Sequence, residues 1–171
     1  MGPMFSLEGK NAAVVGGGSG IGEAVAIAMA EQGAYVACLD INLDEAIATA
    51  DSIRELGGSS DAGHLDIVDA NAVNSSLSNI YADHGSLDIV VCTPGVNVRK
   101  RLIEYTDEEI DLVLGVNLKG NAHVIQGAGR VMIEQGSGSI ILFSSIRSVV
   151  VEIGVVSQVR RCARQLAISR I

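Results

Sequence analysis

Short apolar runs alternate along the chain with longer segments in which apolar residues recur every three or four positions. The short runs are typical of buried strands, and the longer pattern is typical of helices that pack one side against a sheet. The pattern predicts five strands, at residues 11–15, 35–39, 60–65, 87–92 and 139–143. It predicts four helices between them, at residues 21–32, 43–56, between Asp69 and Gly85, and at 107–135.

This alternation predicts an α/β fold, a Rossmann-like doubly wound parallel sheet in a three-layer α/β/α arrangement with right-handed crossovers. The length fits a single domain over residues 1–171. The composition changes after Gln158, where four arginines occur without an acidic residue. Residues 158–171 are therefore expected to form an atypical Arg-rich tail.

Local signals mark several helix ends. Asp69 is expected to cap the third helix, which Gly85 ends, and Thr106 with Glu109 forms a capping box at the start of the fourth. The packing side predicted for the first helix is the stripe Ile21, Val25, Ala28, Met29 and Gln32.

Composition narrows the possible partners. Hydrophobic residues make up 48% of the chain but aromatic ones only 3%, so the core must be built from Val, Ile, Leu and Ala. The formal net charge of −8 argues against nucleic acid and anionic membranes as partners. No apolar run approaches the ~20 residues that span a bilayer, and no charged leader is visible. We therefore expect a cytoplasmic protein.

The cysteines and histidines do not suggest a metal. The three cysteines are widely spaced, and no Cys-x-x-Cys occurs, so neither zinc nor a disulfide framework is indicated. Cys38 and Cys92 lie in apolar strand-like runs and are expected to be reduced and buried. The three histidines share no ligand spacing with one another or with the cysteines.

A glycine-rich loop lies directly between the first predicted strand and the first predicted helix. It reads Gly-Gly-Gly-Ser-Gly-Ile-Gly over residues 16–22. Such a loop lets backbone N–H groups approach a diphosphate, and the helix N-terminus adds favourable partial charge. The candidate dinucleotide-binding residues are Gly16, Ser19, Gly20, Ile21 and Gly22.

An acidic residue ends the second predicted strand. Asp40 lies 18 residues beyond Gly22, where a carboxylate can accept hydrogen bonds from both hydroxyls of a ribose. The same charge would repel a 2′-phosphate, so Asp40 favours NAD over NADP.

Two other kinds of nucleotide-binding loop differ from this one. A phosphate-binding loop of an NTPase ends in Gly-Lys-Ser/Thr, but Glu23 follows Gly22 here. A methyltransferase could use Gly16, Gly18 and Gly20, but the strand before the loop lacks the expected acid. The methyltransferase remains the weakest alternative.

Together these segments resemble the short-chain dehydrogenase/reductase family over residues 6 to about 157. The loop from Gly16 to Gly22 is similar to its cofactor motif, and "LDIV" at 65–68 resembles the segment whose Asp, here Asp66, contacts the adenine. "DIVVCTPGV" at 88–96 aligns with the segment that usually contains Asn-Asn-Ala-Gly, of which only Gly95 is kept. Thr93 keeps a hydroxyl for a local hydrogen bond, whereas Pro94 removes a backbone donor.

The resemblance also implies two residues of the reaction centre. "VNLKG" at 116–120 is similar to the segment with the active-site Asn, here Asn117. "GSIILFSS" at 138–145 is similar to the strand that delivers the substrate-orienting Ser, here Ser145. Long helices like 107–135 often pair between subunits in this family, which makes a homo-oligomer an expectation.

The resemblance predicts a Tyr-x-x-x-Lys pair that this chain lacks. In the family the Tyr supplies the proton and the Lys acidifies it, but Gln158 and Cys162 stand at these positions. No Tyr follows Tyr105, and a carboxamide cannot deliver a proton. The resemblance also implies a longer chain, so the sheet is expected to be incomplete at its C-terminus.

Three functions therefore stay open. The first is a short-chain oxidoreductase that transfers a hydride between NAD(H) and a small alcohol or carbonyl substrate, with impaired activity in this chain. The second is a catalytically silent NAD-binding protein or fragment, and the third is a methyltransferase. We expect cofactor binding and little turnover.

Overall fold

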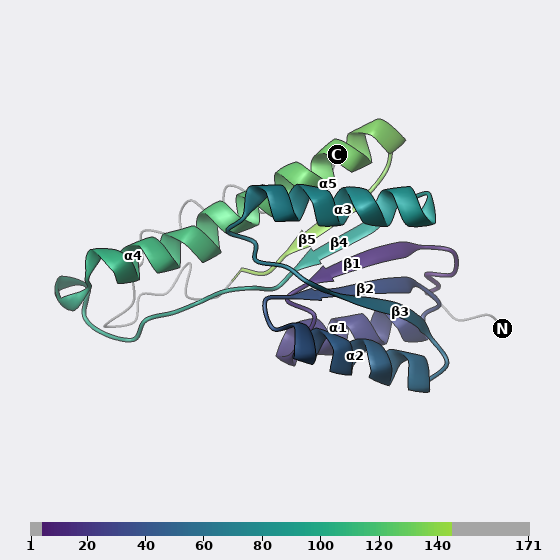
Figure 1. Cartoon of the computed structure of the whole chain (residues 1–171), viewed down its shortest axis with the longest axis horizontal. Coiled ribbons are helices and arrows are strands. Elements are labelled where there is room, and N and C mark those ends of the chain that lie inside the picture. Colours follow the sequence, from purple (N-terminus) through teal and green to yellow (C-terminus); the bar gives the residue numbers. More distant parts are fainter. Residues whose placement is uncertain (1–4, 145–171) are drawn as a thin grey trace.

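The computed structural model describes residues 5–144, and within them it contains one parallel five-stranded sheet (Figure 1). The strand order is β3-β2-β1-β4-β5. The chain therefore moves outward from β1 in one direction and then crosses to the other side of β1 to form β4. The strands are β1 (Asn11–Val15), β2 (Tyr35–Asp40), β3 (Ser59–His64), β4 (Ile89–Cys92) and β5 (Ser139–Leu142).

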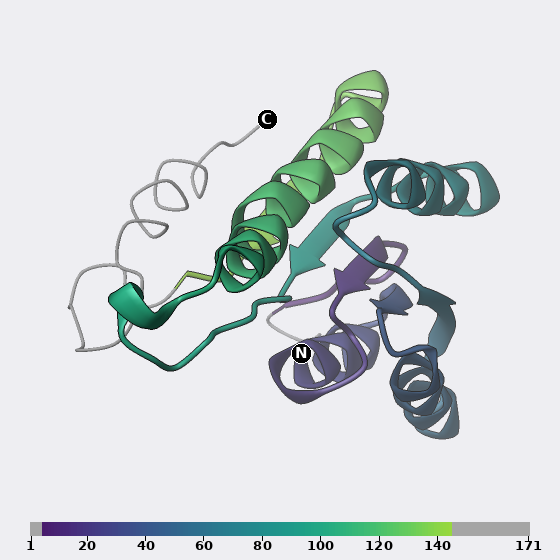
Figure 2. The same ribbon diagram turned by 60° about the vertical axis from the view of Figure 1, so that its left-hand side comes forward.

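Helices cover both faces of this sheet, which confirms the doubly wound, three-layer prediction (Figure 2). One face carries α1 and α2, and the other carries α3 and α5. The bounds are α1 (Gly20–Glu31), α2 (Leu43–Glu55), α3 (Ala70–His84), α4 (Asp107–Leu114) and α5 (Asn121–Gln135).

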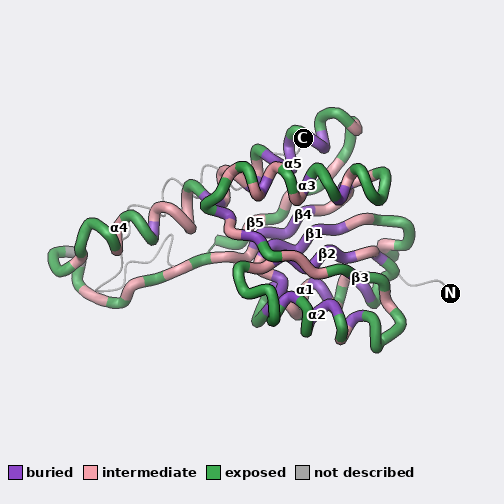
Figure 3. Tube along the Cα trace, viewed as in Figure 1, coloured by how far each residue is buried: buried purple, intermediate pink, exposed green. Residues whose placement is uncertain are grey.

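Side chains of β1 alternate between two hydrophobic clusters. Ala12 and Val14 pack with the helices α1 and α2, whereas Ala13 and Val15 pack with α3 and α5. Burial on both sides explains why this strand is continuously apolar rather than alternating. Figure 3 shows the central strands as the most continuously buried part of the molecule.

The first helix buries a side that only partly matches the predicted one. Its buried residues are Gly22, Ala26 and Ala30, which recur every four positions, whereas Ile21 is 59% exposed. Small side chains on the buried side let α1 approach the sheet closely. The predicted stripe was therefore wrong at Ile21, Ala28 and Gln32, which are exposed, whereas Val25 and Met29 pack partly against the core.

The segment predicted as one long helix contains three parts. The capping box of Thr106 and Glu109 is present at the start of α4, as predicted. Between α4 and α5, residues Gly115–Gly120 form a π-helical segment, η2. A short 3-10 helix, η1 (Leu102–Glu104), precedes α4, which extends past the carboxyl ends of the strands (Figure 1).

Other local predictions agree with the structure. The Asp69 side chain accepts hydrogen bonds from the N–H groups of Asn71 and Ala72, and Gly85 ends α3 in a left-handed conformation. Cys38 and Cys92 are buried free cysteines. Within residues 5–144, no helix has both the length and the apolar character needed to cross a bilayer.

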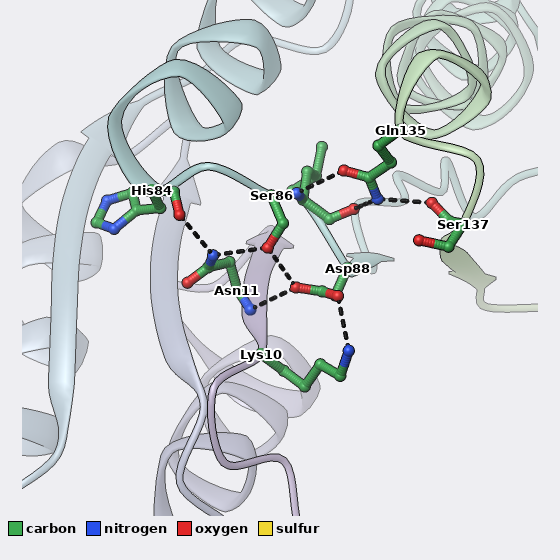
Figure 4. Close-up of polar contacts among 8 residues, drawn as sticks. Lys10, Asn11, His84, Ser86, Asp88, Gln135 and Ser137 are labelled. Atoms are coloured by element: carbon green, nitrogen blue, oxygen red, sulfur yellow. Dashed lines mark hydrogen bonds and ion pairs between the residues drawn. The ribbon is translucent and has the colours of Figure 1, made fainter.

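A polar cluster joins the amino ends of β1 and β4 (Figure 4). The Asp88 carboxylate accepts hydrogen bonds from Asn11 N–H at 3.0 Å and Ser86 Oγ at 2.7 Å, and it pairs with Lys10 Nζ at 2.9 Å. This cluster fixes the two central strands at the end opposite to the glycine loop. The carboxyl ends are left free to build a site.

Candidate functional site

A cavity of about 390 Å³ lies at the carboxyl ends of β1, β2 and β4. This is the point where the strand order reverses, the usual ligand-binding position of open α/β sheets. Its volume lies in the range of small-molecule sites. Seven residues predicted from the sequence line the cavity: Gly16, Ser19, Ile21, Gly22, Asp40, Asp66 and Gly95.

Seven further residues line the cavity but were not predicted as site residues from the sequence. They are Ile41, Leu65, Ile67, Thr93, Pro94, Val96 and Val116. Each is within two residues of a predicted one, so a rule that includes the neighbours of each motif would have found them. Gly20 does not line the cavity, although its φ of +57° forms the turn into α1.

The first N–H groups of the glycine loop are already used within the protein. Gly16 and Gly17 donate to the Leu39 carbonyl at 2.7 and 3.0 Å, and Gly18 donates to Asp40 Oδ2 at 2.9 Å. These bonds tie the loop to the end of β2. Only the N–H groups after Gly18 remain available to a ligand.

The free donors belong to the first turn of α1. Within the described part of the chain, no acceptor binds the N–H groups of residues 19–22. The Ser19 side chain makes no capping hydrogen bond either. Unpaired N–H groups and the positive end of the helix dipole together favour an anion at this position.

Two glycines make this turn possible. Gly16 has φ of +78°, and a Cβ on Gly22 would overlap the carbonyl oxygen of Gly16. Thr93, the residue after β4, contacts the same turn. Its Oγ1 lies 3.1 Å from both the Val15 and the Gly16 carbonyl oxygens. The local hydrogen bond expected for Thr93 is therefore a contact across the sheet.

The Asp40 carboxylate is held in one orientation. Its Oδ2 accepts from the Gly18 N–H, and its Oδ1 accepts from the Asn42 N–H at 2.9 Å. Each oxygen keeps a lone pair for another donor. The carboxylate is thus fixed at the cavity before any ligand arrives.

Asp66 lies on the same cavity between two buried apolar residues. Leu65 and Ile67 are 2% and 4% exposed, whereas one Asp66 oxygen accepts from the Val68 N–H at 2.9 Å. His123 Nδ1 is 3.0 Å from the Ile67 carbonyl oxygen and fastens this loop to α5. An apolar wall with a carboxylate at its rim suits a flat heterocycle that carries an N–H donor.

The side chain of Asn117 faces the chain after β4. Its Oδ1 accepts from Val96 N–H at 2.8 Å, and its Nδ2 donates to the Val96 carbonyl at 2.7 Å. Each end of the amide makes one of these bonds. Asn117 thus holds Val96, which lines the cavity.

Asn121 supports the π-helical segment that carries Asn117. Its Nδ2 donates to the Val116 and Asn117 carbonyls at 3.3 and 3.2 Å, and its Oδ1 accepts from the Cys92 thiol at 3.3 Å. Burial raises the pKa of Cys92 to about 12, so the thiol stays protonated and keeps this bond. Sequence motifs alone did not single out Asn121.

Three residues discussed for the reaction centre, Ser145, Gln158 and Cys162, lie outside the described residues. Within residues 5–144, no three His, Cys, Asp or Glu side chains form a group that could hold a metal ion.

The arrangement fits a dinucleotide. Free N–H groups at the start of α1 match a diphosphate, and the Asp40 carboxylate matches the hydroxyls of an adjoining ribose. A side chain at Gly22 would collide with the backbone of Gly16, so the narrow turn that presents these N–H groups needs glycine there.

Comparisons with known proteins place the chain among oxidoreductases. The profile of the family described as short chain dehydrogenase matches residues 10–157. The chain is 36% identical over 144 residues to D-threitol dehydrogenase of Mycolicibacterium smegmatis. The matched region covers 82% of this chain and 54% of that protein. It is 36% identical over 135 residues to the short-chain reductase protein NovJ of Streptomyces niveus, with coverage of 79% and 52%.

Solved structures agree. A short-chain type dehydrogenase/reductase from Mycobacterium marinum superposes with a TM-score of 0.91 at 29% identity, over 95% of this chain and 68% of that one. NAD⁺-bound xylitol dehydrogenase superposes with a TM-score of 0.90 at 26% identity, over 95% of this chain and 64% of that one. The chain spans about half the length of the curated relatives it matches.

Proposed function

The chain belongs to the short-chain dehydrogenase/reductase family, and from this premise we propose that it binds NAD(H) in the cavity at the end of β1. Members of this family are NAD(P)-dependent oxidoreductases. The proposed reaction class is the interconversion of a small alcohol and its carbonyl compound. The bound cofactor would accept the hydride from the alcohol carbon or return it to the carbonyl.

Each described residue of the site has a proposed task. The N–H groups of residues 19–22 donate to the diphosphate, with the Ser19 hydroxyl beside them. Gly16 and Gly20 shape the turn through their left-handed backbone conformations. Asp66 binds the adenine edge, and Gly95 leaves room for the cofactor beside β4.

The observation that carries the proposal is the position of Asp40. Its carboxylate lines the same cavity as Ser19 and Gly22, and two backbone N–H groups fix its orientation. Its remaining lone pairs suit the two ribose hydroxyls, whereas a 2′-phosphate would meet a fixed negative charge. We therefore propose NAD as the preferred cofactor over NADP.

On the substrate side, we propose that Ser145 orients the oxygen of the alcohol or carbonyl compound. Asn117 acts indirectly, because its amide holds the Val96 segment on the wall of the cavity. These roles assign substrate binding to the region beside β5 and η2.

Titration of the purified chain with NADH and NADPH tests the proposal. Asp40→Asn should raise the Kd for NADH about tenfold, since it removes the charge that accepts from the ribose. It should discriminate less against NADPH. Asp44→Asn removes one negative charge from the exposed first turn of α2 and serves as the matched control. Absence of NADH binding by the unaltered chain would refute the proposal.

A binding-only protein is the second candidate function, and the residues at positions 158 and 162 favour it. Turnover needs a group that moves a proton as the hydride moves, and loss of such a group costs about 10²–10⁴ in rate. Gln158 cannot perform this transfer. A panel of small carbonyl compounds assayed with NADH separates the two candidates. A silent protein would bind NADH but would not oxidise it with any compound of the panel.

We further propose that the protein assembles as a homo-oligomer through the helical region of α4 and α5. Leu112 and Ile133 are exposed by 50% and 67% on these helices. A second copy would remove such apolar surface from water. Sedimentation velocity at several protein concentrations tests this, and a strictly monomeric profile would refute it.

A further inference from the structure

Thr49 is a buried polar residue that belongs to none of the sequence motifs described above. It lies in α2, its exposed fraction is 2%, and its Oγ1 donates to the Gly18 carbonyl at 3.2 Å. The two residues are 31 positions apart in the chain. The hydroxyl thus joins α2 to the middle of the glycine loop.

The direction of this hydroxyl is unusual for a helix. A Thr or Ser inside a helix commonly bonds to the carbonyl four residues earlier in the same helix. Ser52, three residues further along α2, does so with the Ala48 carbonyl at 2.9 Å. Thr49 bonds instead to a carbonyl outside its own helix, so its contact serves the loop.

Gly18 is held from both ends of its backbone. Its carbonyl accepts from Thr49, and its N–H donates to Asp40 Oδ2 at 2.9 Å. A Cβ at this position would lie 2.8 Å from Glu45 Cβ and 3.0 Å from Asp40 Cγ. Gly18 is therefore enclosed between α2 and the end of β2, and its N–H is one of the two backbone groups that hold the Asp40 carboxylate.

We propose that Thr49 is a positioning residue for cofactor selection, acting through Gly18 on Asp40. Its hydroxyl holds the Gly18 peptide so that the N–H of Gly18 fixes one oxygen of Asp40 at the cavity. Without the Thr49 hydroxyl, the Gly18 peptide shifts, and the Asp40 carboxylate can turn away from the ribose position. The inference rests on the proposed NAD(H) binding and adds a residue that determines its specificity.

The readout is the ratio of the Kd values for NADPH and NADH. Thr49→Val removes the hydroxyl and keeps the shape of the side chain. We expect it to raise the Kd for NADH about fivefold, because a buried carbonyl loses its donor and the carboxylate loses its support. The Kd for NADPH should change less, so the ratio should fall.

Two controls isolate the hydroxyl. Thr49→Ser keeps it and should retain the original ratio, and Ser52→Ala removes a hydroxyl of α2 that does not reach the loop. If Thr49→Val does not fold, Thr49→Ala compared with Thr49→Ser gives the same contrast. Thermal unfolding of each variant is measured alongside.

The outcomes separate this inference from the proposed function. A fall in the ratio for Thr49→Val that Thr49→Ser does not show supports the positioning role. A lower melting temperature with an unchanged ratio overturns it, because Thr49 would then be structural only. If the unaltered chain binds neither NADH nor NADPH, the proposed function fails first and the positioning role fails with it.

Discussion

The side-chain amide of Asn117 binds both backbone polar atoms of Val96, accepting from its N–H at 2.8 Å and donating to its carbonyl at 2.7 Å. This pairing imitates the contact between two strands, although it joins a helix to a loop. It holds the chain after β4 where the cavity wall needs it. We therefore propose that Asn117 shapes the site through Val96, which lines the cavity.

Asn117→Ala should release the Val96 segment. Hydrogen exchange of the Val96 amide should accelerate by about tenfold, since its only acceptor among the described residues is lost. The Kd for NADH should rise as the wall loosens. Lys119→Ala alters an exposed residue of the same π-helical segment and should leave both unchanged. Unchanged exchange at Val96 in Asn117→Ala would contradict this role.

The close approach of Gly16 and Gly22 gives a second prediction. Gly22→Ala would place a methyl group on the Gly16 carbonyl oxygen, beside the Thr93 hydroxyl. We expect a loss of about 2–4 kcal/mol in the free energy of unfolding, because backbone rather than a flexible side chain blocks the methyl group. NADH binding should be abolished in whatever protein still folds.

Gly115→Ala is the matched control for Gly22→Ala. Gly115 has φ of −56°, and a Cβ there meets nothing within 4 Å. Replacing it should leave stability unchanged or raise it slightly, because alanine favours the helix over the unfolded chain. Chemical denaturation of both variants gives the comparison. Equal stabilities for the two would show that the loop can open without cost.

Much of this site could be predicted because its signals are local. The glycine loop and Asp40 each follow a strand directly, and parallel strands bring their carboxyl ends to one edge of the sheet. The caps at Asp69 and Thr106 need only residues within one helical turn. Such signals depend on residues close in sequence, so they can be recognised without knowledge of the tertiary structure.

The contacts that were missed join residues far apart in the sequence. Thr49 and Thr93 reach the glycine loop from 31 and 77 positions away, and a hydroxyl on a helix or strand does not reveal its partner in the sequence. The buried side of α1 was predicted only in part, since the glycine and alanines at 22, 26 and 30 have little hydrophobic signal. The π-helical segment was also missed, because residues 115–120 continue the apolar pattern of the helices on either side.

The buried cysteines should resist modification. Burial raises the pKa of Cys38 to about 11 and that of Cys92 to about 12. At pH 8 the thiolate fractions are then on the order of 10⁻³ and 10⁻⁴, and the thiolate is the reactive form. Iodoacetamide should leave both residues unmodified in the native protein and label both in urea, as measured by peptide mass spectrometry. Rapid native labelling of Cys92 would contradict its hydrogen bond to Asn121.

The Asp88 cluster at the other end of the sheet predicts a dependence of stability on pH. Burial alone would raise the pKa of Asp88, but hydrogen bonds from Asn11 N–H, Ser86 and Lys10 outweigh it and lower the pKa. A carboxyl whose pKa is lowered by folding stabilises the protein above its unfolded pKa, about 3.9. That stabilisation is lost as the pH falls through the lowered folded value.

Asp88→Asn should therefore destabilise the protein by about 1 kcal/mol at pH 7, because a carboxamide has one acceptor oxygen and cannot accept both from Lys10 on one side and from Asn11 N–H and Ser86 on the other. The difference from the unaltered chain should shrink below about pH 4, where the unfolded chain begins to bind a proton at Asp88 while the folded chain does not. Asp83→Asn changes an exposed carboxylate of α3 and is the control. Urea denaturation from pH 3 to pH 8 measures the difference, and a constant offset across this range would show that the Asp88 charge contributes nothing to joining β1 and β4.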